Sequence, residues 1–428
     1  MRIPLVPDRR AATIHSDVRE RADIVIVGAG AAGLMTAIWA GRTNPARRIV
    51  LLDGAKVIGA KILVAGGGRC NVTHDEVDER AYAGSTRPAI AKVLRRFDVP
   101  RTAAFFRELG VELKREETGK LFPVTDDAHT VLEALLREVE RVGASLRHPR
   151  RVTGVERTDD GFIVRGDWGS LACASLVLAT GGKALPKSGS DGTGYVLAQA
   201  LGHTVTPRIF PALVPLVLES GHFLRELSGV SFPATLEVRS SRGTRLASFT
   251  NSTLCTHFGL SGPTVLDVSR YFTEAKAGDP GATLVMNLLP GETEHSLDHL
   301  LLANPSQNVG RVLAGRLPER VLKAAVSHAN VDSGAVISTI RRDVRRHLVQ
   351  TLVSLVLPVT GDRGFTHAEV TAGGVPLSEI RLESMESRRH PGLYLVGEIC
   401  DVDGRIGGFN FQWAWASGYV AGASIGGT

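Results

Sequence analysis

One stretch near the N-terminus decides the fold, residues 23–53, with the sequence DIVIVGAGAAGLMTAIWAGRTNPARRIVLLD. Its apolar start, residues 24–27, predicts a buried parallel strand, and a second apolar run, residues 49–52, predicts another. The Ala-rich segment between them predicts a helix. A strand, a helix and a second strand in this order form the βαβ unit of a dinucleotide-binding fold.

The loop after the first predicted strand contains Gly28, Gly30 and Gly33 at G-x-G-x-x-G spacing. In this pattern the first glycine permits a tight turn, the second lets the backbone approach a pyrophosphate, and the third lets helix and strand pack closely. The helix that begins with Ala31 and Ala32 offers unpaired N–H groups and a positive dipole end to the phosphates. The sequence therefore predicts that this protein binds a dinucleotide.

An acidic residue, Asp53, ends the second predicted strand, and Gly54 follows it. A carboxylate at this distance from the glycines is placed to accept hydrogen bonds from the ribose hydroxyls of a dinucleotide. The complete order of strand, glycines, helix, strand and carboxylate favours this interpretation over a plain Gly-rich turn.

The composition is that of a large globular enzyme. A chain of 428 residues predicts two or three domains. The net charge of +6 comes from 50 basic and 44 acidic residues that are scattered along the chain, so we expect no nucleic acid as a partner. The four cysteines form no C-x-x-C pair, which argues against a disulfide framework and a zinc site.

Nothing in the sequence indicates export or membrane insertion. We see no segment with the length and apolarity of a transmembrane helix. Residues 1–22 are charged and lack the apolar core of a signal peptide, so we expect a flexible tail there. The sequence therefore predicts a cytoplasmic protein without a membrane partner, and it gives no indication of the oligomeric state.

The composition and the hydrophobic periodicity of the sequence change along the chain. The Gly-rich residues 54–74 predict an extended loop across the ligand face, and helical apolar spacing follows at 88–110 and 128–143. Short β-like runs separated by Gly and Pro fill residues 205–290, and residues 295–350 have helical and charged character. The predicted parts are a flexible tail (1–22), a nucleotide-binding domain (23–204), an inserted β-rich substrate domain (205–290), a helical subdomain with a return to the β-rich domain (291–365), and a C-terminal part of the nucleotide-binding domain (366–428).

Five motifs in the same order along the chain give it a family resemblance. They are AGGGRCNVTH (65–74), LATGGKALPKSGSDGTGYVLAQALGHTVTP (178–207), THFGLSGPTVLDVSR (256–270), VTAGGVPLSEI (370–380) and GLYLVGEICDVDGRIGGFNFQWAWASGYVAG (392–422). With these motifs the chain resembles the BaiN/YhiN-type flavoproteins, also described as the aminoacetone-oxidase-like family, from about Asp23 to Gly422. The resemblance implies an α/β fold in which a two-dinucleotide-binding-type Rossmann FAD domain is interrupted by an inserted β-rich plus helical domain. It also implies a non-covalently bound FAD and an oxidoreductase.

Two positions depart from the family pattern. The carboxylate at the end of the second strand is usually Glu and is Asp53 here, so we expect a longer or water-bridged contact to the ribose. The aromatic residue of the G-G-Y-N motif is Phe409, which keeps the ring and loses the hydroxyl.

The resemblance and the Gly-rich loops together predict the flavin site. Successive N–H groups at Gly66, Gly67 and Gly68 can face a ligand, although glycine clusters also mark surface turns. A carboxylate at Glu398 suits the ribityl hydroxyls, and the helix N-terminus after Gly407 would stabilise negative charge on the flavin. The remaining predicted cofactor-binding residues are Lys61, Arg69, Cys70, Asn71, Thr73, Ala179, Thr180, Gly181, Gly182, Gly397, Asp403, Gly408, Phe409 and Asn410.

Catalytic residues are harder to predict from these motifs. His257 lies among Gly and Pro turns and is a candidate proton donor, but a structural histidine fits the same pattern. Cys70 is a candidate redox partner of the flavin, but a single cysteine is more often a packing residue. The pair Asp401 and Asp403 fits a helix cap and lacks the further ligands of a metal site, so we expect no metal.

The leading functional hypothesis is an FAD-dependent oxidoreductase that transfers a hydride between the flavin and a small organic substrate. A BaiN-type reductase would take the hydride from NAD(P)H, although the sequence contains no second G-x-G-x-x-G unit for that nucleotide. The alternatives are an oxidase of a small amine that produces peroxide and an RNA-associated or redox-sensing flavoprotein.

Overall fold

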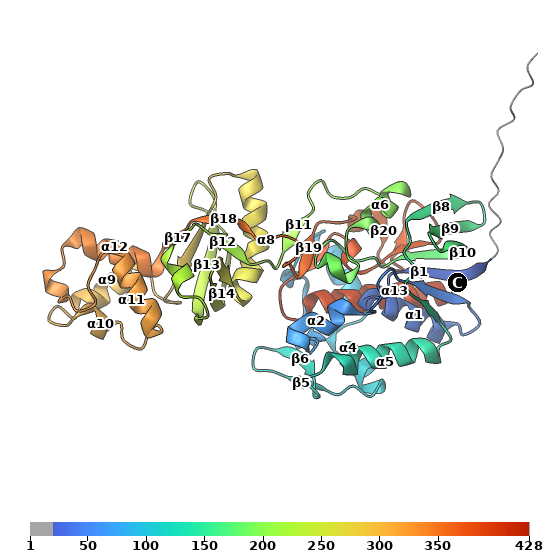
Figure 1. Ribbon diagram of the computed structural model, residues 1–428, viewed down its shortest axis with the longest axis horizontal. Helices are drawn as coiled ribbons and strands as arrows, with labels where there is room; N and C mark the ends of the chain where they lie inside the picture. The colour runs from blue at the N-terminus through green and yellow to red at the C-terminus, as the bar shows by residue number, and fades with distance from the viewer. Residues whose placement is uncertain (1–19, 428) are drawn as a thin grey trace, which may run out of the picture.

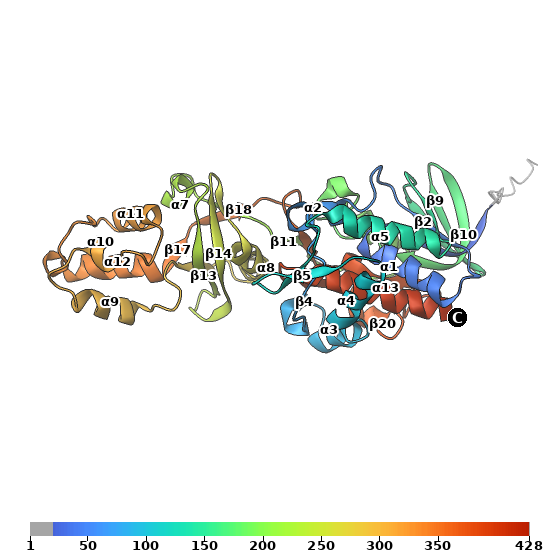
Figure 2. The same cartoon turned by 90° about the horizontal axis from the view of Figure 1, so that it is seen from below.

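The computed structural model describes residues 20–427, and the predicted tail therefore lies largely outside the described residues. The described chain is elongated, with three parts arranged along its long axis (Figure 1). The N-terminal and C-terminal segments form one large domain, an inserted β-rich domain follows it, and a helical subdomain lies at the far end. Figure 2 shows the same order from below.

A nine-stranded sheet organises the large domain. Its central strands are parallel, and their order is β7 (Ser145–Arg147), β2 (Ile49–Leu52), β1 (Arg21–Val27), β10 (Gly169–Leu178) and β22 (Leu393–Leu395). Strands β21 (Glu386–Ser387) and β20 (Ile380–Arg381) add antiparallel pairs at one edge, and β8 (Gly154–Thr158) and β9 (Gly161–Gly166) form a meander with β10. Strands β1 and β2 are apolar and largely buried, as expected for strands of a sheet with both faces covered.

Helices and short strands surround this sheet. The helices are α1 (Ala31–Thr43), α2 (Ala60–Gly68), α3 (Arg87–Leu94), α4 (Val99–Glu108), α5 (Ala128–Arg141), α6 (Thr193–Ala200) and α13 (Phe409–Gly427). The short strands are β3 (Thr73–His74), β5 (Leu113–Arg115) and β6 (Lys120–Pro123) in one sheet, and β4 (Tyr82–Gly84) with β23 (Val402–Gly404) in another.

The C-terminal helix α13 packs directly against α1, and its glycines make this possible. A Cβ at Gly418 would lie 2.6 Å from the carbonyl oxygen of Ala32, and one at Gly422 would lie 2.5 Å from that of Thr36. Larger residues would separate the two helices, so these small residues fix the C-terminal helix on the first βαβ unit.

The inserted domain contains a seven-stranded sheet. The order is β17 (Leu355–Leu357), β16 (Thr283–Asn287), β13 (Ser231–Arg239), β14 (Arg245–Thr256), β15 (Gly259–Ser261), β12 (Leu216–Leu218) and β18 (Val359–Asp362). Helices α7 (Phe223–Glu226) and α8 (Pro263–Gly278) accompany it, and the helical subdomain consists of α9 (Glu294–Leu302), α10 (Val309–Val312), α11 (Glu319–His328) and α12 (Arg342–Val353). A two-stranded ladder of β11 (Phe210–Ala212) and β19 (Val370–Ala372) lies where the chain passes between the large and inserted domains (Figure 1).

The predicted fold class is confirmed: an α/β nucleotide-binding domain is interrupted by a β-rich plus helical insertion. Two local predictions were wrong. The segment 54–74 is not an extended loop throughout, because it contains α2, and the β-rich stretch contains the long helix α8. No helix within residues 20–427 combines the length and apolarity needed to cross a membrane.

Candidate functional site

A cavity of about 640 Å³ opens at the carboxyl ends of the central strands. Gly28, Asp53, Ala179 and Gly397 line it, and each follows closely on one of the strands β1, β2, β10 and β22. Ligands of open α/β sheets bind at this edge, and the volume is within the range of about 300–1,000 Å³ of small-molecule sites. This cavity is therefore the candidate ligand site.

The three glycines of the first loop differ in what surrounds them. A Cβ at Gly28 would lie 2.3 Å from the carbonyl oxygen of Ala179, and one at Gly33 would lie 1.9 Å from that of Gly28. Gly28 also has φ +104°, a conformation that favours glycine. Gly30 has no atom within 4 Å of its missing Cβ and lines the cavity, as do Ala31 and Ala32 at the start of α1. The loop thus combines two packing glycines with one that leaves room for a ligand.

Asp53 stabilises the same loop through two hydrogen bonds. One carboxylate oxygen accepts a hydrogen bond of 2.7 Å from the N–H of Ala29, and the other accepts one of 2.7 Å from the N–H of Ala55. Both bonds hold the carboxylate at the cavity wall beside Gly54. Each oxygen keeps a second lone pair that can accept a hydrogen bond from a ribose hydroxyl.

The Gly-rich segment of α2 forms another wall. Gly66, Gly67 and Gly68 have φ values of +58°, +72° and +87°, and Gly66 and Gly67 line the cavity while Gly68 does not. The guanidinium of Arg69 lies 4.0 Å from the centre of the Phe122 ring and pairs with Glu116 at 2.6 Å. Arg69 lines the cavity, and its pairing with Glu116 fixes the position of its guanidinium there.

Glu398 is the centre of a polar network at the wall that the C-terminal segment forms. It accepts a hydrogen bond of 2.5 Å from Lys61 and one of 3.0 Å from the N–H of Thr371. Lys61 also donates to the hydroxyl of Ser190 at 3.1 Å. All of these residues except Thr371 line the cavity, so the network presents oriented polar groups to a ligand.

The N-terminus of α13 also reaches the cavity. Gly407, Gly408 and Asn410 line it. The Asn410 side chain accepts a hydrogen bond from the N–H of Gly404 at 2.8 Å and donates to the Gly404 carbonyl at 2.9 Å, which fixes the preceding loop. The positive end of this long helix therefore faces the ligand site and favours negative charge there.

The described residues fit a dinucleotide with a polar ring. Two buried oxygens at the cavity, Asn71 Oδ1 and Thr180 Oγ1, have no hydrogen-bond partner within residues 20–427. Buried polar atoms are nearly always satisfied, so these two indicate a ligand that supplies donors. The open space at Gly30 and the helix N-termini of α1 and α13 suit a pyrophosphate and an electron-rich ring.

Several predicted cofactor residues lie outside the cavity lining. Thr73 donates to Gln412 at 2.7 Å, Phe409 stacks on His74 with ring centres 5.0 Å apart, and Asp403 pairs with Arg270 at 2.7 Å. The others outside the lining are Gly33, Gly68, Cys70 and Gly182, whereas Ala179, Gly181 and Gly397 are part of it.

Neither candidate catalytic residue is brought to the cavity. His257 lies in the turn between β14 and β15 of the inserted domain, where its carbonyl accepts a hydrogen bond from Arg225. Cys70 is buried, and burial raises the pKa of its thiol to about 12, which disfavours the reactive thiolate. Cys70 therefore has the surroundings of a packing residue.

Other cavity residues could not be singled out from the sequence. Glu369 and Leu213, from the connection between the domains, line the cavity, as do Lys120 and Ile406. Arg405 lines it too and pairs with Asp267 of α8 at 3.0 Å. Only Arg405 and Ile406 stand in one of the five motifs, and the position of Glu369 just before VTAGG is the one further signal that the sequence offers.

A second, more polar cavity of about 390 Å³ adjoins the first. Lys120, Arg405 and Ile406 line both cavities. His74, Arg80 and Asn251 also line the second one, which therefore lies between the large domain and the inserted domain. Within residues 20–427, no cluster of three or more His, Cys, Asp or Glu side chains could hold a metal ion.

Comparison with known proteins assigns the chain to a family of enzymes. The model of the HI0933-like protein Rossmann domain matches residues 22–424. The ribosomal RNA dihydrouridine synthase of Escherichia coli K12 is 34% identical over 404 residues, which cover 94% of this chain and 97% of that protein. The 3-dehydro-bile acid delta(4,6)-reductase of Clostridium scindens is 32% identical over 403 residues, with 93% and 98% covered. A solved 3-ketosteroid-delta4-(5alpha)-dehydrogenase of Rhodococcus jostii aligns with a TM-score of 0.48 at 16% identity, over 97% of this chain and 99% of that one.

The chain belongs to the HI0933-like Rossmann-domain family. It is an oxidoreductase with FAD as its cofactor, which confirms the predicted enzyme class and cofactor. The predicted resemblance to the BaiN/YhiN-type flavoproteins is likewise confirmed.

Proposed function

We propose that this protein is a flavin-dependent reductase that adds two hydrogens across a carbon–carbon double bond conjugated to a carbonyl group. This proposal is supported by the activities for which its full-length relatives are named. Dihydrouridine is uridine with its C5–C6 double bond saturated, beside the C4 carbonyl, and the delta(4,6) bonds of a 3-dehydro-bile acid are conjugated to its 3-oxo group. The two acceptors differ greatly in size but share this arrangement of atoms.

The first candidate substrate is a uracil base in ribosomal RNA. Dihydrouridine synthases of two bacteria, Escherichia coli and Haemophilus influenzae, match at 34% and 33% identity over 94% of this chain. The second cavity adjoins the first at Lys120, whose positive charge suits a phosphate that accompanies a base. Its other cations, Arg80 and Arg405, are paired with Asp78 and Asp267. RNA as a substrate departs from the small molecule that the sequence predicts.

The second candidate substrate is a small polycyclic enone, as the bile-acid reductase suggests. The cavity is lined by apolar side chains at the interdomain end, Leu213, Val370 and Ile406, which suit a hydrocarbon ring. This candidate agrees with the small-molecule substrate that the sequence predicts.

Bound FAD would supply the hydride for the reduction. The chain itself would hold the cofactor through the loop of Gly28 and Gly30, the carboxylates of Asp53 and Glu398, and the unsatisfied oxygens of Asn71 and Thr180. The N-terminus of α13 would stabilise negative charge on the bound ring. We propose NAD(P)H as the electron donor, bound transiently over the cavity.

The test follows the two halves of the reaction separately. The purified holoprotein is mixed anaerobically with NADH and then NADPH, and bleaching of the flavin absorption is recorded. The reduced protein is next mixed with unmodified ribosomal RNA or with a 3-oxo-Δ4 steroid, and mass spectrometry detects a gain of two hydrogens. Reoxidation by one acceptor identifies the substrate class. Reoxidation by oxygen alone, with peroxide formed, contradicts the proposal and favours the oxidase alternative.

A further inference from the structure

Four carboxylates line the cavity, and three of them form hydrogen bonds or ion pairs with other protein groups. Asp53 accepts hydrogen bonds from two backbone N–H groups, and Glu398 is held by Lys61 and Thr371. Asp191 accepts from Thr193 and pairs with Arg151. The carboxyl group of the fourth, Glu369, has no hydrogen-bond or ion-pair partner among residues 20–427.

The backbone holds Glu369 at the interdomain side of the cavity. Its N–H donates to the carbonyl of Leu213 at 3.2 Å, and the following residue, Val370, pairs with Ala212 in the ladder of β11 and β19. The ladder lies at the junction of the large and inserted domains (Figure 1). The side chain is accessible because the open cavity adjoins it, so a bound substrate can reach its carboxyl group.

The protein around Glu369 raises the pKa of its carboxyl group above the ordinary value. Desolvation by the surrounding protein raises the pKa of the carboxyl group, Lys120 on β6 lowers it, and Asp267 on α8 raises it. Asp267 is itself paired with Arg405. A raised pKa is the property that a carboxylic acid needs to donate a proton near neutral pH.

Other proton donors at the cavity are few. Within the described residues, the lining contains no His, Tyr or Cys side chain. Lys61 is engaged by Glu398, which leaves Lys120 as the one other lining amine. The reaction proposed above needs one proton in addition to the hydride, and Glu369 is the acid that the cavity offers.

We infer that Glu369 is the catalytic acid that protonates the substrate carbon next to the carbonyl group, with Lys120 as a positioning residue. This inference rests on the proposed reductase function. Bound FAD would supply the hydride that forms the C–H bond at the far carbon, and the π electrons would move toward the carbonyl group. The O–H bond of Glu369 breaks as its proton forms the second C–H bond. The resulting carboxylate is reprotonated by water.

The experiment uses holoprotein reduced with dithionite, so that it does not depend on NAD(P)H. Glu369→Gln should retain FAD and thermal stability but be reoxidised by the acceptor at least about 100-fold more slowly than wild type. Glu383→Gln is the matched control, because Glu383 forms an exposed ion pair with Lys92 away from the cavity. A pH titration of the oxidised flavin spectrum adds a readout without turnover: wild type should show a transition that Glu369→Gln lacks.

Two further variants sharpen the test. Lys120→Met removes a positive charge that favours the Glu369 carboxylate, so the spectral transition and the basic limb of the rate profile should move to higher pH. Glu369→Ala should regain part of its rate with added formate.

The outcomes distinguish failure of the proposed reductase function from failure of the role of Glu369. A wild-type flavin that neither acceptor reoxidises contradicts the reductase function itself, whereas Glu369→Gln with wild-type rate and pH profile overturns the inference alone.

Discussion

At the scale of single residues, the glycines of the first loop show that one residue type serves different purposes. Gly33 is required by packing, since its missing Cβ would lie 1.9 Å from the carbonyl oxygen of Gly28. Gly30 is surrounded by open space and lines the cavity. Gly33 is therefore needed for packing in the folded state, and we propose that Gly30 leaves room for the bound cofactor.

These roles predict different responses to the same substitution. Gly33→Ala must push α1 from the loop, so we expect a loss of about 1–3 kcal/mol in unfolding free energy at any FAD concentration. Gly30→Ala should unfold within about 0.5 kcal/mol of wild type at saturating FAD, because its methyl group meets no protein atom. Its dissociation constant for FAD should rise, since the methyl group occupies space near the pyrophosphate.

Thermal denaturation across an FAD concentration series distinguishes the two effects. The deficit of Gly30→Ala should disappear as FAD approaches saturation, whereas that of Gly33→Ala should persist. Equal behaviour of the two variants would contradict the separate roles.

The same scale shows why part of the site could be predicted and part could not. Gly28, Gly30 and Asp53 belong to a pattern whose spacing is local in the chain, and the structure places all three at the cavity. Glu369 stands alone before a short strand, and only the pairing of β19 with β11 brings it to the cavity. No local pattern encodes such a contact.

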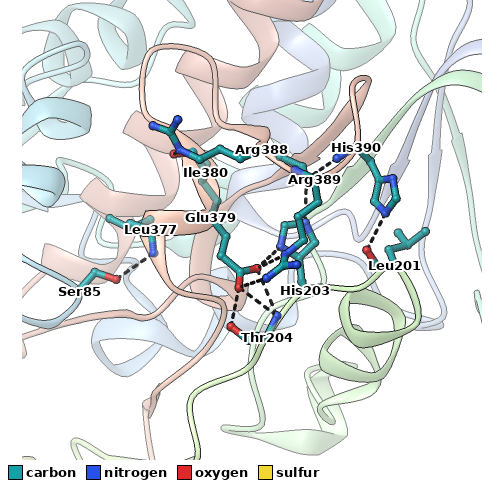
Figure 3. A network of polar contacts seen from close by, with 11 residues as sticks. Ser85, Leu201, His203, Thr204, Leu377, Glu379, Ile380, Arg388, Arg389 and His390 are labelled. Atoms are coloured by element: carbon teal, nitrogen blue, oxygen red, sulfur yellow. Dashed lines mark hydrogen bonds and ion pairs between the residues drawn. The ribbon is translucent and has the colours of Figure 1, made fainter.

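At the scale of elements, a buried polar network ties the end of α6 to the edge of the large sheet (Figure 3). His203 contacts Glu379 at 2.6 Å through Nδ1 and Ser387 at 2.9 Å through Nε2. The serine, histidine and glutamate are arranged as in a hydrolase triad, but Ser387 and His203 are buried and neither lines a described cavity. Ser387 instead accepts hydrogen bonds from the N–H groups of Arg389 and His390, so the network is structural.

This network predicts acid sensitivity of the fold. Desolvation raises the pKa of Glu379, but hydrogen bonds from Arg389, Thr204 and His203 outweigh it and bring the pKa to about 2. A depressed pKa contributes stability above about pH 4.5, the unfolded value, which is lost as the pH falls toward 2. Desolvation lowers the pKa of His203, so protonation of the unfolded chain below about pH 6.5 acts in the same direction.

Glu379→Gln should therefore flatten the dependence of unfolding free energy on pH between about 4.5 and 2, by an amount on the order of 1–3 kcal/mol. Denaturant titrations at a series of pH values measure this slope. Glu319→Gln serves as the control, because Glu319 forms an exposed ion pair with Lys323 one turn along the same helix. A slope unchanged in Glu379→Gln would contradict the role of the network.

Elements with a strong local pattern could be predicted, and others could not. The helix predicted at 128–143 is α5, which ends at Arg141. It could be predicted because Asp127 caps its start and its apolar residues share one face. The helix α2 was missed because its glycines resemble a loop and its residues 65–67 depart from helical geometry. The helix α8 was missed because flanking Gly and Pro residues are typical of turns between strands.

At the scale of the whole molecule, two ion pairs join α8 of the inserted domain to β23 and to the loop that follows it before α13. Arg270 pairs with Asp403 at 2.7 Å, and Arg405 pairs with Asp267 at 3.0 Å. Asp267 also accepts a hydrogen bond of 2.8 Å from the N–H of Ile406. Since Arg405 and Ile406 line both cavities, these bonds set the position of the inserted domain relative to the first cavity. The sequence pattern assigned Asp403 to the cofactor, because its partner on α8 is distant in the chain.

Removal of one partner of the Arg270–Asp403 ion pair should destabilise the contact between the two domains more than removal of both. Arg270→Met leaves Asp403 as a buried carboxylate without its cation, so we expect a loss of about 3–5 kcal/mol in unfolding free energy. The double variant Arg270→Met/Asp403→Leu removes both charges and should recover a large part of that loss. Arg341→Met, which breaks the exposed pair with Asp343, should change stability by less than about 1 kcal/mol.

Calorimetry should also resolve separate unfolding transitions for the two domains in Arg270→Met, because the contact that couples the domains is weakened. A single variant as stable as the Arg341 control, with one cooperative transition, would show that the domains are held together by other contacts.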